Sequence, residues 1–160
     1  MPAPVNDYVA TMRELVGSRP MLVPGVRALI FNPQQEILLM RRRDMPCWCL
    51  PSGGVELGES ALDALRREVA EETSLAVLEA KPMALYSGPS HKFTYPNGDE
   101  VYCFAIAFVV RRWQGSPRAD GVEGSEVGFF SLSELPQDLA PLHQATIEDH
   151  GNYRGTFLLR

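Results

Sequence analysis

Residues 53–75 of this chain read GGVELGESALDALRREVAEETSL, and this stretch decides the fold. It places Glu68, Glu71 and Glu72 at positions i, i+3 and i+4, so on a helix the three carboxylates share one face. Like charges at that spacing destabilise a helix unless a cation lies among them. The alternative, a solvated acidic face, suits a lone Glu-Glu pair better than a pattern of this length. The stretch therefore predicts a metal site built into a helix.

The acidic helix is predicted over residues 60–73. Ser60, with Asp63 three positions later, resembles a capping box, although aspartate is a weaker partner than glutamate in that motif. We expect one face of the helix to pack on the core, with Glu68 and Glu72 along its edge. The packed stripe consists of Leu62, Leu65 and Val69.

The chain has the size and composition of one globular domain. Its 160 residues are 45% hydrophobic and 22% charged, so residues 1–160 are predicted to form a single domain with one core. The net charge of −5 argues against general affinity for nucleic acid or membrane surfaces. There is no signal-like leader and no apolar run near 18 residues, and three cysteines suit a reducing compartment. We therefore expect a cytoplasmic protein.

Strand and helix signals alternate along the rest of the chain. The further predicted helices cover residues 5–16, 133–136 and 142–149. The predicted strands cover 21–31 and 37–40, joined as a hairpin, and then 48–51, 75–86, 101–113 and 127–132. A glycine-rich loop, 52–54, leads into the acidic helix, and Asn97-Gly98 marks a tight turn within the loop 87–100. Strands interleaved with few helices indicate an α/β or α+β domain with a mixed sheet.

The acidic cluster favours a particular chemistry. Carboxylates on a helix that follows a glycine-rich loop suit Mg²⁺ or Mn²⁺, which prefer oxygen ligands. Mg²⁺ keeps several waters and commonly bridges substrate phosphates. The reaction that fits is attack of water on phosphorus, with a carboxylate that is not consumed by the metal as general base.

These residues also carry a family resemblance. The pattern Gly53-x5-Glu59-x7-Arg67-Glu68-Val69-x-Glu71-Glu72-x-Ser74-Leu75 resembles the Nudix box of the Nudix hydrolases (MutT-related proteins). The similarity extends over residues 21–136, more weakly outside the box. It implies the Nudix fold, an α/β/α sandwich, and cleavage of the pyrophosphate bond in a nucleoside diphosphate linked to another moiety.

The resemblance also implies roles for individual residues. Glu68, Glu71 and Glu72 would bind the divalent cations, with Glu68 the candidate for helping to deprotonate water. Gly53 would offer backbone contacts near a metal. Glu59 and Arg67 would pair and orient the helix; alternatively, Arg67 is a solvated partner of Glu71 or Asp63.

A further acidic ligand in such enzymes often comes from a later loop. Glu123 and Glu126, which precede the strand at 127–132, are the candidates, and both could instead be surface charges. Ser74 departs from the family pattern, which has glycine there. If that position is left-handed, serine costs about 1 kcal/mol but leaves the carboxylates intact.

Substrate recognition is less readable from the sequence. Arg41 and Arg42 could contact phosphates or be solvated, and Tyr95, in an aromatic and basic loop, could stack on a base or pack on the domain. His143 and His150 are expected to be structural or solvated.

The leading hypothesis is a Mg²⁺-dependent pyrophosphohydrolase that acts on a small nucleotide. The alternatives are a catalytically silent nucleotide sensor, which predicts damaged carboxylates, and an RNA 5′-end pyrophosphohydrolase, which the acidic composition disfavours. A homodimer is also open, because the N-terminal helix could pack on its own domain or on a second copy.

Overall fold

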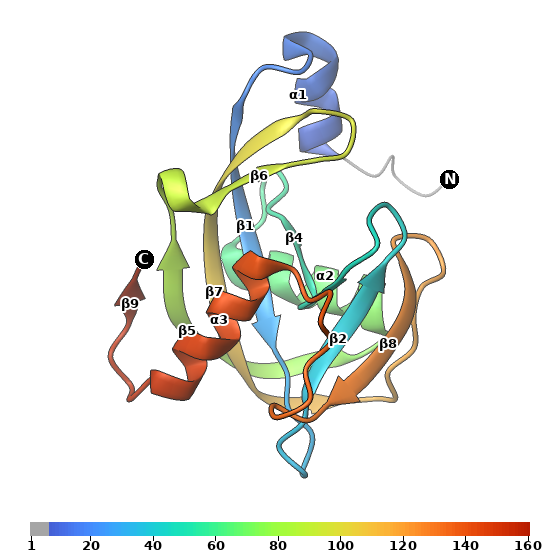
Figure 1. The fold of residues 1–160 in the computed structure, drawn as a ribbon, viewed down its shortest axis with the longest axis vertical. Helices are drawn as coiled ribbons and strands as arrows, with labels where there is room; N and C mark the ends of the chain where they lie inside the picture. Colours follow the sequence, from blue (N-terminus) through green and yellow to red (C-terminus); the bar gives the residue numbers. More distant parts are fainter. Residues whose placement is uncertain (1–6) are drawn as a thin grey trace.

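The computed structural model describes residues 7–160, drawn as a ribbon in Figure 1. Its helices are α1 (Tyr8–Val16), α2 (Ala61–Thr73), the short 3-10 helix η1 (Pro89–His91) and α3 (Pro141–Asn152). Its strands are β1 (Met21–Leu29), β2 (Ile37–Arg42), β3 (Trp48–Cys49), β4 (Ser52–Gly54), β5 (Ala76–Tyr86), β6 (Lys92–Thr94), β7 (Glu100–Gln114), β8 (Gly124–Phe130) and β9 (Leu158–Leu159). Within these residues, no helix has the length and apolar character needed to cross a membrane.

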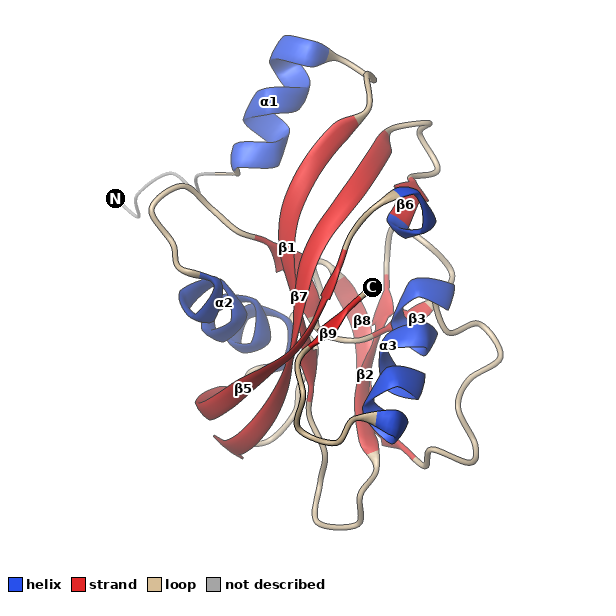
Figure 2. Cartoon of the chain, turned by 90° about the vertical axis from the view of Figure 1, so that its left-hand side faces the viewer, coloured by secondary structure: helices blue, strands red, loops and turns tan. Residues whose placement is uncertain are grey.

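Two sheets and the helices form layers. The larger sheet has the order β4-β1-β7-β5-β9, with β6 added to β7, and is mixed because β1 runs parallel to β7 and β9 parallel to β5. The smaller sheet places β2 between β3 and β8, all antiparallel. Figure 2 shows α2 on one side of the larger sheet, and α3 with the smaller sheet on the other. The predicted α/β/α sandwich with a mixed sheet is therefore confirmed.

The alternation of side chains along β1 separates two hydrophobic clusters, because successive residues of a strand point to opposite faces. Val26 and Ala28 pack with Leu65 and Val69 of α2. Leu29 belongs to the other cluster, which α3 and the smaller sheet complete. Arg27, which shares the face of Leu29, is a charged residue inside an otherwise apolar strand.

The predicted hairpin of residues 21–31 and 37–40 is wrong. The two segments meet only at its closed end, where Leu38 N–H donates to the Ile30 carbonyl and Phe31 bridges Ile37. Both edges of β1 are already paired, one with β7 along its whole length and the other with β4. The next strand, β2, therefore leaves this sheet and becomes the centre of the smaller one.

Three loop and helix assignments also need correction. Residues 52–54 were expected to be a loop but form β4, because their backbone pairs with β1. The helix predicted at 133–136 is a turn, in which Glu134 N–H bonds to the Ser131 carbonyl. The loop 87–100 contains η1 and β6, and β6 turns into β7 through the predicted Asn97-Gly98 turn, where Gly98 has a φ of +90°.

The ends of α2 follow the sequence prediction. The Ser60 hydroxyl accepts from Asp63 N–H, and the Asp63 carboxylate accepts from Ser60 N–H, which completes the capping box. Ser74 ends the helix in the left-handed conformation, at φ +62°, and its N–H bonds to the Ala70 carbonyl. Glu68 and Glu72, which were predicted to lie along the edge of the packed face, are both buried.

The N-terminal helix was predicted over residues 5–16; α1 begins at Tyr8, and residues 5 and 6 lie outside the described part of the chain. It packs on its own domain through Tyr8 N–H, which donates to Glu56, and Arg13, which donates to the Glu100 carbonyl.

Candidate active site

The helix α2 brings two of its glutamates into the interior. Because Leu65 and Val69 anchor one face of α2 against the larger sheet, Glu68 and Glu72 are turned toward β4. Glu68 is 8% exposed and Glu72 only 3%. One oxygen of Glu72 accepts a hydrogen bond from the Ser52 N–H at 2.9 Å, so the carboxylate is held in place by the backbone of β4.

A third carboxylate reaches this pair from a distant loop. Oxygen atoms of Glu68, Glu72 and Glu123 all lie within 4.8 Å of one another, and we call these three residues the carboxylate cluster. Asp120 fixes the loop, because its carboxylate accepts from the N–H groups of Val122, Glu123 and Gly124.

Glu71 and Glu126 lie outside the carboxylate cluster. The Glu71 side chain is 54% exposed and bonds to Arg67, although it lines the same hollow. Glu126 is exposed and pairs in register with Arg41 on β2. Of the two candidate loop ligands, the structure therefore brings only Glu123 to the carboxylates of α2.

The carboxylate cluster is electrostatically unfavourable as it stands. Burial, and then the neighbouring charge of Glu68, raises the pKa of Glu72 well above its usual value. Burial raises the pKa of Glu68 to about 7, although hydrogen bonds from Arg67 oppose the shift. Burial also raises the pKa of Glu123. A divalent cation among these oxygens would offset both the desolvation and the mutual repulsion, so the donor set fits Mg²⁺ or Mn²⁺.

Arg67 connects the carboxylates to the loop before the helix. Its guanidinium donates to both oxygens of Glu59, at 2.6 and 3.0 Å, and this contact lowers the pKa of Glu59. It also donates to Glu68 at 2.9 Å, to Glu71 at 3.3 Å and to the Gly54 carbonyl at 2.9 Å. Arg67 therefore has the contacts needed to orient both Glu68 and β4.

Gly53 lies directly against the carboxylate cluster. A Cβ atom added at Gly53 would collide with the carboxylate of Glu68. The requirement for glycine is therefore one of space, since this close approach of β4 to α2 leaves no room for a side chain.

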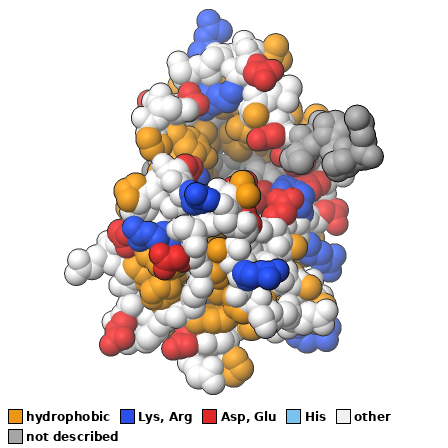
Figure 3. All heavy atoms as spheres, turned by 90° about the vertical axis from the view of Figure 1, so that its right-hand side faces the viewer, with side chains coloured by type: hydrophobic (Ala, Val, Ile, Leu, Met, Phe, Trp, Pro, Cys, Tyr) orange, Lys and Arg blue, Asp and Glu red, His pale blue; other side chains and the backbone are white. Residues whose placement is uncertain are grey.

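Two connected hollows open beside these groups. The carboxylate hollow, of about 540 Å³, is lined by the three glutamates of the carboxylate cluster together with Arg67 and Glu71. The apolar hollow, of about 190 Å³, lies between β1, β7, β6 and the start of α3. Both are bordered by Val23, Arg42, Ser52, Gly53, Gly54, Tyr95 and Val101. Figure 3 shows hydrophobic side chains gathered around a hollow below α1, with acidic side chains near it.

The two predicted substrate arginines lie on opposite faces of β2, and Tyr95 directly follows β6. Arg42 lines both hollows, as does Tyr95, and Arg42 forms a two-point ion pair with Asp44. Arg41 points to the opposite face, where it bonds to Asp138 at 2.9 Å and lies over the ring of Trp48. The structure therefore brings Arg42 and Tyr95 to the site, but not Arg41.

Two residues that line the apolar hollow were not assigned to the site from the sequence. Arg27 lines it from β1, and His143, which was expected to be structural or solvated, lines it from α3. A signal existed for Arg27, because a charged residue within an apolar strand needs a partner or a function. His143 carried no such signal, since its place depends on how α3 packs.

A family model and several known proteins are similar to this chain. The family model described as NUDIX domain matches residues 21–150. A Bacillus subtilis (strain 168) protein named "Putative 8-oxo-dGTP diphosphatase" is 35% identical over 133 residues, which are 82% of each chain. An ADP-ribose pyrophosphatase of Methanocaldococcus jannaschii is 33% identical, over 93% of this chain and 86% of the relative.

A solved structure shares the fold of this chain. The crystal structure of a MutT NUDIX hydrolase from Burkholderia pseudomallei superposes with a TM-score of 0.68 at 26% identity, covering 80% of this chain and 97% of the other.

Proposed function

The chain is a Nudix hydrolase, a member of the NUDIX family, and we propose that it is a divalent-cation-dependent pyrophosphohydrolase of small nucleotide derivatives. It would cleave the pyrophosphate bond of a nucleoside diphosphate linked to another moiety. The observation that carries the proposal is the carboxylate cluster, three glutamates from two distant segments whose oxygens lie within 4.8 Å of one another. An intact cluster of this kind favours an enzyme over a silent sensor.

Mg²⁺ or Mn²⁺ is the cofactor that this donor set suits, and Glu68, Glu72 and Glu123 would hold it, with Glu71 next to them. When bound, the cation would supply charge neutralisation for the phosphates and activation of water. The backbone of Gly53 borders the same space and leaves it open, because glycine has no side chain there.

The residues of the chain itself have separate tasks in this proposal. Glu68 or Glu71 takes the proton of the attacking water. Arg67, clamped by Glu59, holds Glu68 and Glu71 at fixed distances through its guanidinium. Arg42, at the border between the two hollows, would meet the phosphates.

The names of the relatives point to different substrates. One is named for 8-oxo-dGTP and another for ADP-ribose, and a third, from Caulobacter vibrioides, is an RNA pyrophosphohydrolase, 29% identical over 140 residues. Family membership therefore leaves the nucleotide open. The net charge of −5 disfavours RNA, because a polyanion needs an extended basic surface.

The test is a panel of nucleoside triphosphates, nucleotide sugars, ADP-ribose, dinucleoside polyphosphates and 5′-triphosphate RNA, with Mg²⁺ or Mn²⁺ and with a chelator. We expect cation-dependent cleavage of a small nucleotide into a nucleoside monophosphate and the phosphorylated remainder, which is pyrophosphate for a triphosphate and a sugar phosphate for ADP-ribose or a nucleotide sugar. Glu72→Gln should lower kcat by about 1,000-fold or more with the fold intact, because a buried ligand is lost. The matched control is Glu79→Gln. Glu79 is an exposed residue of β5 that pairs with Arg112 on β7, so this variant should retain full activity.

Undiminished turnover in Glu72→Gln would contradict the assignment of the cation to these carboxylates. Turnover of 5′-triphosphate RNA alone would favour the RNA alternative instead.

A further inference from the structure

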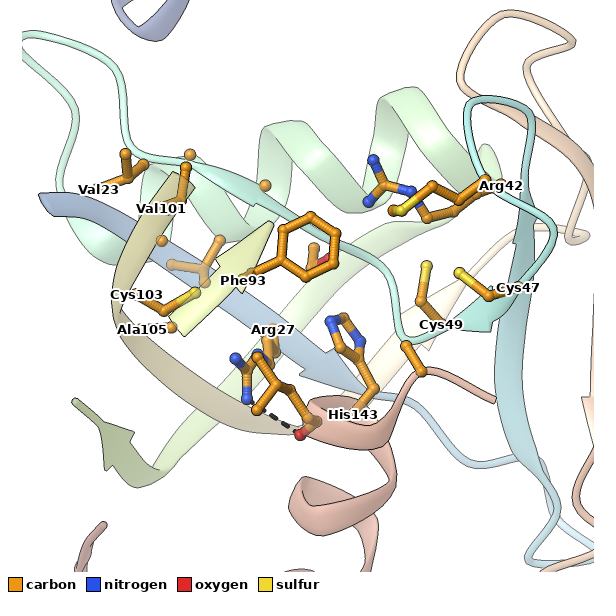
Figure 4. Close-up of a pocket in the computed structure, with 18 of the residues that line it drawn as sticks. Val23, Arg27, Arg42, Cys47, Cys49, Phe93, Val101, Cys103, Ala105 and His143 are labelled. Atoms are coloured by element: carbon orange, nitrogen blue, oxygen red, sulfur yellow. Dashed lines mark hydrogen bonds between the residues drawn. The ribbon is translucent and has the colours of Figure 1, made fainter. Parts of the chain in front are cut away.

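A few polar side chains interrupt the mostly apolar lining of the apolar hollow, and two of them, Arg27 and His143, are nitrogen bases. Its walls include Phe93, Val101 and Ala105, as Figure 4 shows, and among residues 7–160 no carboxylate or carboxamide side chain lines it. Arg27 and His143 are polar groups that belong to this hollow alone. Ser52, Tyr95 and Arg42 lie at its border with the carboxylate hollow. Any polar part of a ligand that goes deep into this space therefore meets Arg27 and His143.

Arg27 is a buried cation with spare donors. It is 3% exposed, and no carboxylate among residues 7–160 forms an ion pair with it. Its Nη1 donates to Thr146 Oγ1 at 2.9 Å and to the Leu142 carbonyl at 3.3 Å, and the guanidinium lies over the Tyr86 ring. A guanidinium has five N–H groups, so Nε and Nη2 keep donors for which the described residues offer only the weakly accepting sulfur of Cys103.

His143 presents a donor as well. Its Nδ1 accepts a hydrogen bond from Leu50 N–H at 3.0 Å, so in the neutral ring the proton resides on Nε2. Burial holds the pKa of His143 well below its usual value, and the nearby charge of Arg27 acts in the same direction. Among the described residues Nε2 has no acceptor, and Figure 4 shows the His143 ring on the same side of the cavity as Arg27.

We propose that the apolar hollow binds the base of the nucleotide, and that Arg27 and His143 select a base whose edge carries a carbonyl oxygen. The inference deepens the proposed function and rests on it for the identification of the ligand as a nucleotide. The observation behind it is that Arg27 and His143 keep N–H groups without an oxygen or nitrogen acceptor among residues 7–160, beside walls that offer a base apolar contact, Phe93 among them.

The chemistry of the bases explains the selection. Guanine and hypoxanthine present two acceptors, O6 and N7, on one edge, which match an arginine fork. Adenine replaces O6 with an N6 amino group, and that donor would face the donors of Arg27. Uracil and cytosine differ in the same way at position 4. A buried donor opposite a donor leaves both unpaired, so adenine and cytosine are disfavoured.

The test compares bases that differ at this one position. The dissociation constants of inosine and adenosine 5′-monophosphate, and of the uridine and cytidine pair, are measured by calorimetry with the full chain and Mg²⁺. We expect the inosine compound to bind about 10-fold or more tightly than the adenosine compound, and uridine more tightly than cytidine. Equal binding, preference for adenosine, or no binding of either compound would overturn the inference.

Variants assign the preference to Arg27. In Arg27→Met the ratio between the inosine and adenosine compounds should fall toward 1, and Arg27→Lys should keep part of it. Thr146→Val removes an acceptor that positions Nη1 and should lower the ratio without removing the charge. Arg112→Lys, on the exposed face of β7, is the control and should leave the ratio unchanged. If Arg27→Met does not fold, Thr146→Val and the wild-type ratio still decide.

Turnover separates this inference from the proposed function. Selection of inosine without any cation-dependent hydrolysis would contradict the enzyme and leave the base assignment standing. Cation-dependent hydrolysis with preference for adenosine would support the enzyme and overturn the base assignment.

Discussion

Glu72 combines deep burial with a negative charge. Its side chain is 3% exposed, has a hydrogen bond from Ser52 N–H, and lies beside the carboxylates of Glu68 and Glu123. Burying a carboxylate next to others is unfavourable unless a cation compensates. The position of this residue is therefore better explained by binding than by stability.

Gly53 allows a test at the scale of one residue. We predict that Gly53→Ala lowers kcat by about 100-fold, because the new Cβ displaces the Glu68 carboxylate and a shift of about 1 Å is enough for such a loss. The measurement is steady-state turnover of the best substrate of the panel.

Gly151→Ala is the matched control, since no atom of the described residues, apart from its chain neighbours and the nearby backbone of α3, lies within 4 Å of a Cβ at that position. It should retain activity and gain about 0.5–1 kcal/mol of stability, as alanine replaces glycine in a helix. Full activity of Gly53→Ala would show that turnover does not depend on the close contact between Gly53 and Glu68, which would contradict the prediction.

At the scale of the element, α2 was the part that sequence predicted best. Its capping box and its acidic face are local, so spacing reveals them, whereas the left-handed end at Ser74 was raised as a possibility only by the resemblance to a family that has glycine there. Glu123 and Glu126 could not be separated in this way. Their distance from α2 depends on the loop that Asp120 organises, which brings in Glu123 and leaves Glu126 outside the carboxylate cluster.

The raised pKa values on α2 predict an unusual dependence of stability on pH. The folded pKa of Glu68 is about 7, and that of Glu72 is also raised, against an ordinary value near 4.5. The folded state then binds more protons than the unfolded state across this window, so the contribution of these groups is fully present below pH 4.5 and is lost as pH rises through 7. Without cation, Glu72→Gln should be more stable than wild type at pH 8, by an excess that shrinks toward pH 5.

Urea denaturation of both proteins at a series of pH values, in chelator and in excess Mg²⁺, measures this excess. Because the histidines are common to both proteins, their titration cancels in the difference. Mg²⁺ should stabilise the wild type at pH 8 and leave Glu72→Gln unaffected. A difference that does not vary with pH would contradict the electrostatic account of the carboxylate cluster.

At the scale of the whole molecule, the site depends on contacts that no local pattern encodes. The turn between β1 and β2 is real, but the two strands part because β4 and β7 occupy both edges of β1. The same arrangement opens the apolar hollow between β1, the β6–β7 hairpin and α3, three parts of the chain far apart in the sequence. The fold class and the acidic site were therefore predictable, whereas Arg27 and His143 as cavity residues were not. A homodimer through α1 stays a prediction.

The proposed function requires that the carboxylate cluster bind a divalent cation. The most direct test is an anomalous difference map from crystals soaked in Mn²⁺, for wild type and for Glu72→Gln. We predict a strong peak within about 2.0–2.4 Å of oxygens of Glu68, Glu72 and Glu123 in the wild type, weakened or absent in the variant. A map without a peak among these oxygens, or with an equal peak in the variant, would contradict it.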